Sequence, residues 1–195
     1  MDKTVHELLN QQVNKEFYSA YLYLEFSNYF KAKGLDGFAN WYMIQAQEER
    51  DHAMLFYTYL QNQNQTVTLE AIDKPEPSIT CHMDVLKAGL AHEEYVTSLI
   101  NGIYSAAYDV KDFRTMQFLD WFVKEQGEEE TNANDLISKM ERSALTPRAC
   151  ICSIRSWPQE STPRPLWFCK QISYEQKAAK ENRQICRSLL CGFIS

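Results

Sequence analysis

Apolar residues recur at spacings of three and four along most of the first 141 residues, which is the pattern of amphipathic α-helices. Four such stretches run from about residue 4 to 33, 37 to 63, 81 to 109 and 112 to 141. Most aromatic residues fall at helical spacing and none lies in a clear period-two strand. The sequence therefore predicts an all-α protein.

The connections between these stretches predict how the helices are arranged. Gly34 and Gly37 mark a short break after the first stretch, and a short turn at 109–112 separates the third from the fourth. The middle connection, from residue 61 to about 78, is long and polar and contains K-P-E-P. Two short links on either side of a long one indicate an antiparallel four-helix bundle with a long crossover between helices 2 and 3.

Carboxylates interrupt every apolar stripe near its middle. The inward positions include, in chain order, Glu16, Glu49, His52, Glu93, Glu125 and Glu129. An isolated buried carboxylate is costly, and several converging ones repel each other, whereas a bound cation removes both penalties. Carboxylates mixed with imidazole suit a first-row transition metal better than calcium or magnesium. Because Glu49 and His52 lie one helical turn apart, we expect them to ligate the same centre.

Ferritin-like di-iron proteins take one Glu from each of two helices and a Glu-x-x-His motif from each of the other two. Here Glu16 and Glu93 are the single acids, residues 49–52 form one motif, and residues 129–132 form a second that lacks its histidine. Residues 1–141 resemble a prokaryotic non-haem ferritin, through N-x-E-x-Y-x-A-Y-L-Y, A-Q-E-E-R-D-H, H-E-E and E-Q-G-E-E-E in the four stretches.

The resemblance implies a di-iron ferroxidase centre. Glu16, Glu49 and His52 would hold one iron, and Glu49 as a bridge, Glu93 and Glu129 would hold the other. A third iron is implied at a set of four acids, Glu48, Glu125, Glu128 and Glu129. Three further residues are implied near the oxygen chemistry: Gln126 as a polar partner, and Tyr23 and Trp121 as hydrogen-bond or electron donors, although core packing explains these two rings equally well. No haem is expected.

The activity implied is oxidation of Fe(II) by O2 or H2O2, with ferric oxyhydroxide stored in a homo-oligomeric cage of 24 subunits. One alternative is an iron-binding subunit whose altered tail prevents normal cage assembly. Another is a rubrerythrin-like, peroxide-reducing di-iron protein. The alternative with a rubredoxin-type iron is disfavoured, because the cysteines after residue 141 lack paired C-x-x-C spacing.

The chain changes character after Glu141. Residues 1–141 hold 11 Lys and Arg against 23 Asp and Glu, whereas residues 142–195 hold 9 against 3. Five of the six cysteines also lie in the second part. We therefore expect residues 1–141 to form the bundle and residues 142–195 to form an atypical, largely irregular tail in place of a fifth helix.

The tail suggests a hypothesis about its origin. Its possible codons, read two nucleotides out of phase from Ala149 onward, allow L-Y-L-L-D-Q-E-L-A-A, which resembles the fifth helix of a ferritin. The hypothesis is a frameshifted end, and the alternative is a genuine lineage-specific extension. A gene sequence without a continuous ferritin-like ending in that phase would refute the frameshift.

Several remaining features bear on cellular location, partners and the exposure of individual residues. The amphipathic N-terminus lacks the apolar run of a signal peptide, which favours a cytoplasmic protein. Neither a nucleic-acid partner nor a membrane is expected. His6, His82 and His92 show no partner pattern and are expected at the surface, and Glu130 is expected to point away from the core.

Overall fold

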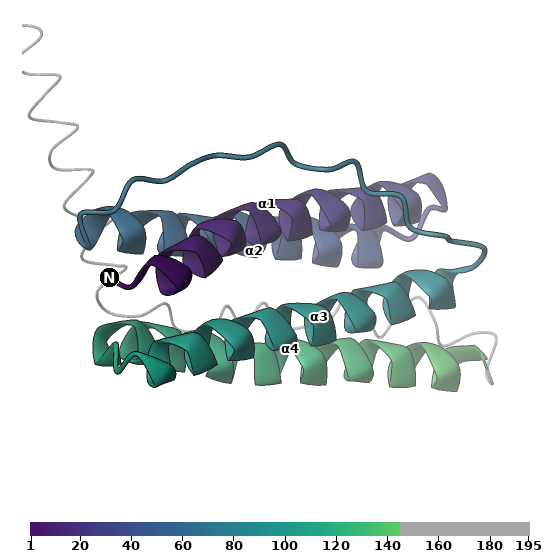
Figure 1. Cartoon of the computed structure of the whole chain (residues 1–195). Helices are drawn as coiled ribbons and strands as arrows, with labels where there is room; N and C mark the ends of the chain where they lie inside the picture. The colour runs from purple at the N-terminus through teal and green to yellow at the C-terminus, as the bar shows by residue number, and fades with distance from the viewer. Residues whose placement is uncertain (145–195) are drawn as a thin grey trace, which may run out of the picture. The chain divides into compact units, whose positions relative to one another are not determined.

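The structure is a computed structural model, and it describes residues 1–144. Its four helices are α1 (Lys3–Ala32), α2 (Asp36–Asn62), α3 (His82–Asp109) and α4 (Phe113–Ala144). α1 packs against α2, α3 packs against α4, and α1 also contacts α3 (Figure 1). The predicted all-α four-helix bundle with a long crossover is confirmed.

The helix ends have local causes in the sequence. Asp2 caps α1, because its Oδ1 accepts hydrogen bonds from the backbone N–H groups of Thr4 and Val5. Gly34 ends the same helix with φ of 71°, a left-handed conformation that glycine adopts without steric cost. At the start of α3, the Asp84 carboxylate accepts hydrogen bonds from Thr80 and Cys81, which lower its pKa to about 2.

The crossover, residues 63–81, lies alongside α1 over its first part. The Asn10 side chain forms hydrogen bonds with both the N–H and the carbonyl of Thr68. One turn later, Asn14 Nδ2 donates to the carbonyl of Ala71, at 3.0 Å. These amide side chains hold this part of the crossover against α1. The crossover spans from the end of α2 to the start of α3 (Figure 1).

Two aromatic clusters fill the bundle on either side of its middle. One contains Phe30, stacked on Phe38 and Tyr42 with ring centroids 4.8 and 5.7 Å apart. The other contains Phe56, whose ring lies 4.3 Å from that of Phe122. The six polar positions predicted to face inward are all buried: Glu16, Glu49, His52, Glu93, Glu125 and Glu129. The carboxylates lie between the two aromatic clusters and are shielded from solvent, so an unpaired charge there would be costly.

The predicted domain boundary at residue 141 falls inside α4, which continues to Ala144. The predicted irregular tail, its replacement of a fifth helix and the frameshift hypothesis otherwise concern residues outside the described part. None of the described helices is both long enough and apolar enough to cross a membrane.

Candidate metal centre

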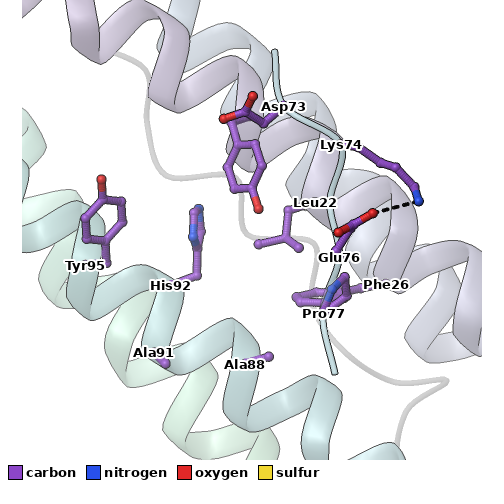
Figure 2. A pocket seen from close by; sticks show the side chains of 11 residues that line it. Leu22, Phe26, Asp73, Lys74, Glu76, Pro77, Ala88, Ala91, His92 and Tyr95 are labelled. Carbon is purple, nitrogen blue, oxygen red and sulfur yellow. Dashed lines mark hydrogen bonds and ion pairs between the residues drawn. The ribbon is translucent and has the colours of Figure 1, made fainter. Parts of the chain in front are cut away.

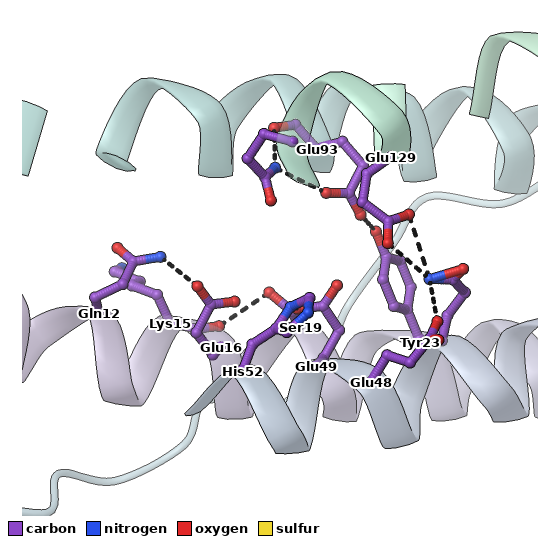
Figure 3. Close-up of polar contacts among 12 residues, drawn as sticks. Gln12, Lys15, Glu16, Ser19, Tyr23, Glu48, Glu49, His52, Glu93 and Glu129 are labelled. Carbon is purple, nitrogen blue, oxygen red and sulfur yellow. Dashed lines mark hydrogen bonds and ion pairs between the residues drawn. The ribbon is translucent and has the colours of Figure 1, made fainter. Parts of the chain in front are cut away.

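Three predicted ligands from α1 and α2 meet in the middle of the bundle. Each of Glu16, Glu49 and His52 offers a ligand atom, and these atoms all lie within 4.8 Å of one another (Figure 3). All three side chains are buried, with residue exposures of 1%, 3% and 6%. The Nδ1 atom of His52 is 3.4 Å from Oε2 of Glu49. The predicted sharing of one centre by Glu49 and His52 agrees with this geometry.

Glu16 carries an unsatisfied oxygen at this centre. Its Oε1 accepts a hydrogen bond of 2.8 Å from Nε2 of the buried Gln12, whereas its buried Oε2 accepts none within residues 1–144. Burial, followed by the charge of Glu49, raises the pKa of Glu16 well above its usual value. A cation beside Oε2 would supply the missing partner and stabilise the ionised carboxylate.

Glu49 and His52 form an ion pair within this group. Burial alone would raise the pKa of Glu49, but the hydrogen bond and the charge of His52 outweigh it and lower that pKa. Burial likewise lowers the pKa of His52, yet Glu49, Glu16 and Glu125 together raise it to about 9. In the metal-free protein a proton on the imidazole therefore partly compensates the charge of the carboxylates.

The other two predicted ligands of the di-iron pair, Glu93 on α3 and Glu129 on α4, are arranged differently. The Tyr23 hydroxyl donates to Oε1 of Glu93, and Gln126 Nε2 donates to its Oε2 at 3.2 Å. Gln45 Nε2 lies 3.2 and 3.3 Å from the two oxygens of Glu129. Protein donors therefore partner both carboxylates, and neither belongs to the group of three described above.

The electrostatics of this second pair also favour a bound cation. Burial raises the pKa of Glu93 to about 7. Burial, and then the charges of Glu93 and Glu49, raise the pKa of Glu129 well above its usual value. A small cavity of about 20 Å³ is lined by Tyr23, Gln45, Glu93 and Glu129 among others. That volume holds roughly one water-sized occupant.

The predicted third set is only partly assembled. Glu125 is buried, and its charge is one of those that raise the pKa of His52. Glu48 is half-buried, and its Oε2 accepts a hydrogen bond of 3.2 Å from Gln45. Glu128 is also half-buried and pairs at 3.1 Å with Lys124, one turn earlier on the same helix. The structure thus brings Glu48 towards Glu129 and directs Glu128 to Lys124.

The two predicted aromatic partners both lie beside the ligands. Tyr23 is buried and donates to Glu93, as described above. The half-buried Trp121 meets His52 edge-on, with ring centroids 5.5 Å apart and an interplanar angle of 75°. Both positions are compatible with the predicted roles, and the redox role of either ring stays a prediction.

Two expectations about neighbouring residues are wrong. Glu130 does not simply point away, because its Oε1 accepts a hydrogen bond of 2.6 Å from Thr97 Oγ1 on α3. His92 is half-buried, and its Nε2 lies 2.8 Å from Ser19 Oγ on α1. Helix–helix proximity creates both partners, and spacing within one helix carries no signal of it.

The same expectation is wrong for His6 and His82, which are also half-buried and hydrogen-bonded. His6 Nε2 lies 3.0 Å from the carbonyl oxygen of Thr66, and His82 Nδ1 lies 3.1 Å from the Tyr29 hydroxyl. Both contacts join helices to segments far away in the sequence. They stabilise the ends of the bundle rather than its centre.

The sequence analysis missed the role of two buried amides. Gln12 precedes its partner Glu16 by four residues, whereas Gln45 precedes its partner Glu48 by three and also donates to Glu129 on α4. A polar residue one turn before a buried acid is a usable signal, because side chains four apart share a helix face. The structure buries both amides.

An open hollow of about 610 Å³ lies outside this centre, between α1, α3 and the crossover (Figure 2). His92 and Tyr95 form part of its wall on α3, and residues 73–77 of the crossover border it. The His92 ring also meets Tyr23 edge-on, with centroids 5.9 Å apart. His92 therefore contacts both the hollow and Tyr23, which in turn donates to Glu93.

The helical part of the chain is similar to known proteins. The ferritin-like domain of the ferritin family matches residues 6–143. The bacterial non-heme ferritin of Campylobacter jejuni is 36% identical over 140 residues, which cover 72% of this chain and 84% of that protein. A bacterial non-heme ferritin of Staphylococcus epidermidis is 33% identical over 142 residues, covering 73% and 86%.

Solved structures give the same result. The open pore ferritin from Archaeoglobus fulgidus superposes with a TM-score of 0.77 at 36% identity, covering 80% of this chain and 96% of that chain. An iron-soaked variant of PmFTN superposes with a TM-score of 0.74 at 27% identity, with coverages of 80% and 96%. The chain therefore belongs to the ferritin family.

Proposed function

We propose that this protein is an iron-storage ferroxidase that oxidises Fe(II) inside its own helical bundle. Family membership supports a role in iron storage. The observation that carries the oxidation proposal is the buried group of Glu16, Glu49 and His52, in which one oxygen of Glu16 lacks a hydrogen bond within residues 1–144. A carboxylate and imidazole set of this kind suits iron.

The substrate would be bound as a pair of Fe(II) ions. Glu16, Glu49 and His52 would hold the first, and Glu49 as a bridge, Glu93 and Glu129 would hold the second. The small cavity beside Glu93 and Glu129 supports this second position. In two-metal sites generally the ions lie roughly 3.5–4 Å apart. At that separation the two ions would each give one electron to the same oxidant, which together with two protons reduces O2 to H2O2 or H2O2 to water.

The side chains have separate tasks in this reaction. Glu16, Glu93 and Glu129, whose pKa values are raised, release their protons when metal binds, so they change from neutral to anionic as positive charge arrives. His52 must also lose its proton before its nitrogen can ligate. Gln126, which donates to Glu93, would act as a polar partner near the oxidant. Tyr23 and Trp121 would supply a hydrogen bond or an electron.

A third iron would bind at Glu48, Glu125, Glu128 and Glu129. Its support is the shared carboxylate Glu129, together with Glu48 placed beside it by Gln45. To join this set, Glu128 would release Lys124. Surface ion pairs of this kind contribute about 0–1 kcal/mol, so this step costs little.

Oxidation is tested by adding Fe(II) to the full-length protein in air and following ferric absorbance and O2 consumption together. We expect oxidation to be much faster than in buffer alone, with saturation at a fixed number of Fe(II) ions per subunit. Preloading with Zn(II), which has no redox chemistry, should suppress it. Oxidation no faster than in buffer would refute the ferroxidase proposal.

Storage requires the chains to assemble, and we propose a cage of 24 subunits. The described helices contain the proposed iron ligands, so oxidation and assembly are separate properties. Sedimentation velocity on the full-length chain is the decisive measurement. A single large closed species that retains far more iron after desalting than its proposed ligands could hold would support storage, whereas dimers that oxidise iron without retaining it would support the iron-binding subunit instead.

A further inference from the structure

Gln45 on α2 stands between two sets of proposed ligands. Its side chain is buried, with 6% of the residue exposed. Its Nε2 atom lies 3.2 Å from Oε2 of Glu48 and 3.2 and 3.3 Å from the two oxygens of Glu129. An amide nitrogen carries two hydrogens, so one group donates to both carboxylates.

This contact joins two helices and two carboxylates that are assigned to different iron positions. Glu48 lies three residues after Gln45 on α2, whereas Glu129 comes from α4. Glu48 belongs only to the proposed third iron, and Glu129 is shared with the di-iron pair. Two carboxylates in a poorly solvated space repel each other, and a shared neutral donor is what allows them to face one another.

The other amide and hydroxyl donors at the centre each contact fewer proposed ligands than Gln45 does. Within residues 1–144, the side-chain hydrogen bonds of Gln12, Tyr23 and Gln126 to proposed ligands reach only one ligand each, either Glu16 or Glu93. Gln45 differs because its partners belong to different sites. Without its N–H groups, the carboxylates of Glu48 and Glu129 would face each other with no shared donor between them, and their repulsion would favour separation.

We propose that Gln45 is a positioning residue for the third iron, because its amide holds Glu48 towards Glu129 before that iron arrives. The proposal rests on the function proposed above. It makes Gln45 the physical link between the oxidation centre and the neighbouring iron position. Loss of the link should affect the third iron and leave the Glu16, Glu49 and His52 group able to bind.

The test is an anaerobic titration of the full-length protein with Fe(II) alone, with the heat of binding measured by isothermal calorimetry. The unmodified chain and Gln45→Leu are compared. We expect Gln45→Leu to bind one fewer Fe(II) ion per subunit, or to bind the last ion about 10–100-fold more weakly, as is typical when an outer-shell partner is lost. The first ion, held by Glu16, Glu49 and His52, should bind as in the unmodified protein, because none of these three is a hydrogen-bond partner of Gln45 in the described residues.

Gln12→Leu is the matched control. It is the same substitution at another buried glutamine that donates to a proposed ligand, but its partner is Glu16 alone. It should weaken the first ion and keep the last. A general packing defect would instead affect the two variants alike, so the contrast separates positioning from a structural role.

A double-mutant cycle adds a second readout. Glu48→Ala should lose the same ion as Gln45→Leu, and the double variant should lose nothing further, because both changes act on one interaction. Gln45→Met repeats the test with an unbranched side chain if leucine prevents folding, which circular dichroism of the metal-free protein would show.

The outcomes are distinct. If Gln45→Leu binds as many ions as tightly as the unmodified protein, the positioning role is wrong while the proposed function stands. Additive losses in the double variant would also overturn it. If the unmodified protein binds no Fe(II), the proposed function fails and this inference fails with it.

Discussion

The two halves of the proposed iron centre differ in how far the protein alone assembles them. Glu16, Glu49 and His52 already place ligand atoms within 4.8 Å of one another, and one oxygen of Glu16 has no hydrogen bond within residues 1–144. Glu93 and Glu129, in contrast, are partnered by protein donors. In the first half a carboxylate oxygen lacks a hydrogen-bond partner in the described residues, and a cation could take that place. In the second half both carboxylates already accept hydrogen bonds from the protein.

The difference follows from where the ligands come from. Two members of the first half lie one turn apart on α2, so helix geometry alone places them together. The second half comes from α3 and α4, and its carboxylates are kept in place by Tyr23, Gln45 and Gln126. We therefore expect the first half to bind metal before the second, since the second must exchange hydrogen bonds for metal ligation.

The largest effect should come from removing the carboxylate common to both halves. Glu49→Ala should lower the rate of Fe(II) oxidation by more than about 100-fold, beyond the range for outer-shell partners. Stopped-flow measurement of ferric absorbance checks this. Glu94→Ala, which changes an exposed acid next to Glu93, is the control and should keep the unmodified rate. Equal rates for Glu49→Ala and Glu94→Ala would contradict the assignment.

The order of filling can be tested by removing each half separately. His52→Ala should abolish or weaken the first ion in an anaerobic Fe(II) titration by at least about 10-fold, whereas Glu93→Gln should leave that ion in place and weaken the second. Isothermal calorimetry measures both. A first ion that depends equally on Glu93 and His52 would show that the halves do not fill in sequence.

The pH dependence should distinguish the metal-free protein from the loaded one. The pKa of Glu93 is raised from 4.5 to about 7, so the folded state holds a proton that the unfolded state releases. The stability contributed by that proton is complete below about pH 4.5 and is lost as pH rises through about 7. The melting temperature of metal-free protein should therefore fall over this window more steeply than that of Glu93→Gln.

Bound metal should offset this loss of stability at neutral pH. Excess Zn(II) should raise the melting temperature by several degrees near neutral pH and much less near pH 4.5, because binding requires deprotonated ligands. Scanning calorimetry with and without Zn(II) makes the comparison. A Zn(II) effect independent of pH would mean that the raised carboxyl pKa values are not coupled to metal binding.

The smallest effects should come from the aromatic partners. Tyr23→Phe removes one hydrogen bond to Glu93 and should slow oxidation by less than about 10-fold, consistent with about 1 kcal/mol for one such bond. Tyr59→Phe is the matched control, because it removes a hydrogen bond to Thr115 in the aromatic cluster around Phe56, away from the proposed ligands. Rapid mixing measures both rates. Equal slowing in the two variants would reduce Tyr23 to a packing role.

Trp121→Phe should have a still smaller effect on the rate, because its ring packs against His52 without a hydrogen bond to a proposed ligand in the described residues. Stopped-flow spectra would show whether an oxidised tryptophan forms. Loss of such a transient signal together with a large drop in rate would assign Trp121 a larger part than packing.

Much of the bundle could be predicted from the sequence because helical periodicity is a local property. The predicted stripes place Glu16, Glu49, Glu93 and Glu129 inward, and the structure buries all four. The one-turn spacing of Glu49 and His52 likewise predicted their shared centre. These features depend on a few neighbouring residues and on the fixed rise of a helix.

The partners across helices could not be predicted in this way. Glu130 was expected to face away but meets Thr97, and His92 was expected at the surface but meets Ser19. Such contacts depend on how far each helix is rotated and shifted along its neighbour. The packing of side chains between helices sets that register, and periodicity within one helix does not encode it.

Helix formation, the direction of each helix face and the acids and imidazole on those faces all follow from local residue spacing. Only the tertiary structure decided that Glu16, Glu49 and His52 stand together while Glu93 and Glu129 take Tyr23, Gln45 and Gln126 as partners. The reason is physical: the inward direction of a side chain follows from helix geometry, whereas its partner follows from the packing of whole helices against one another.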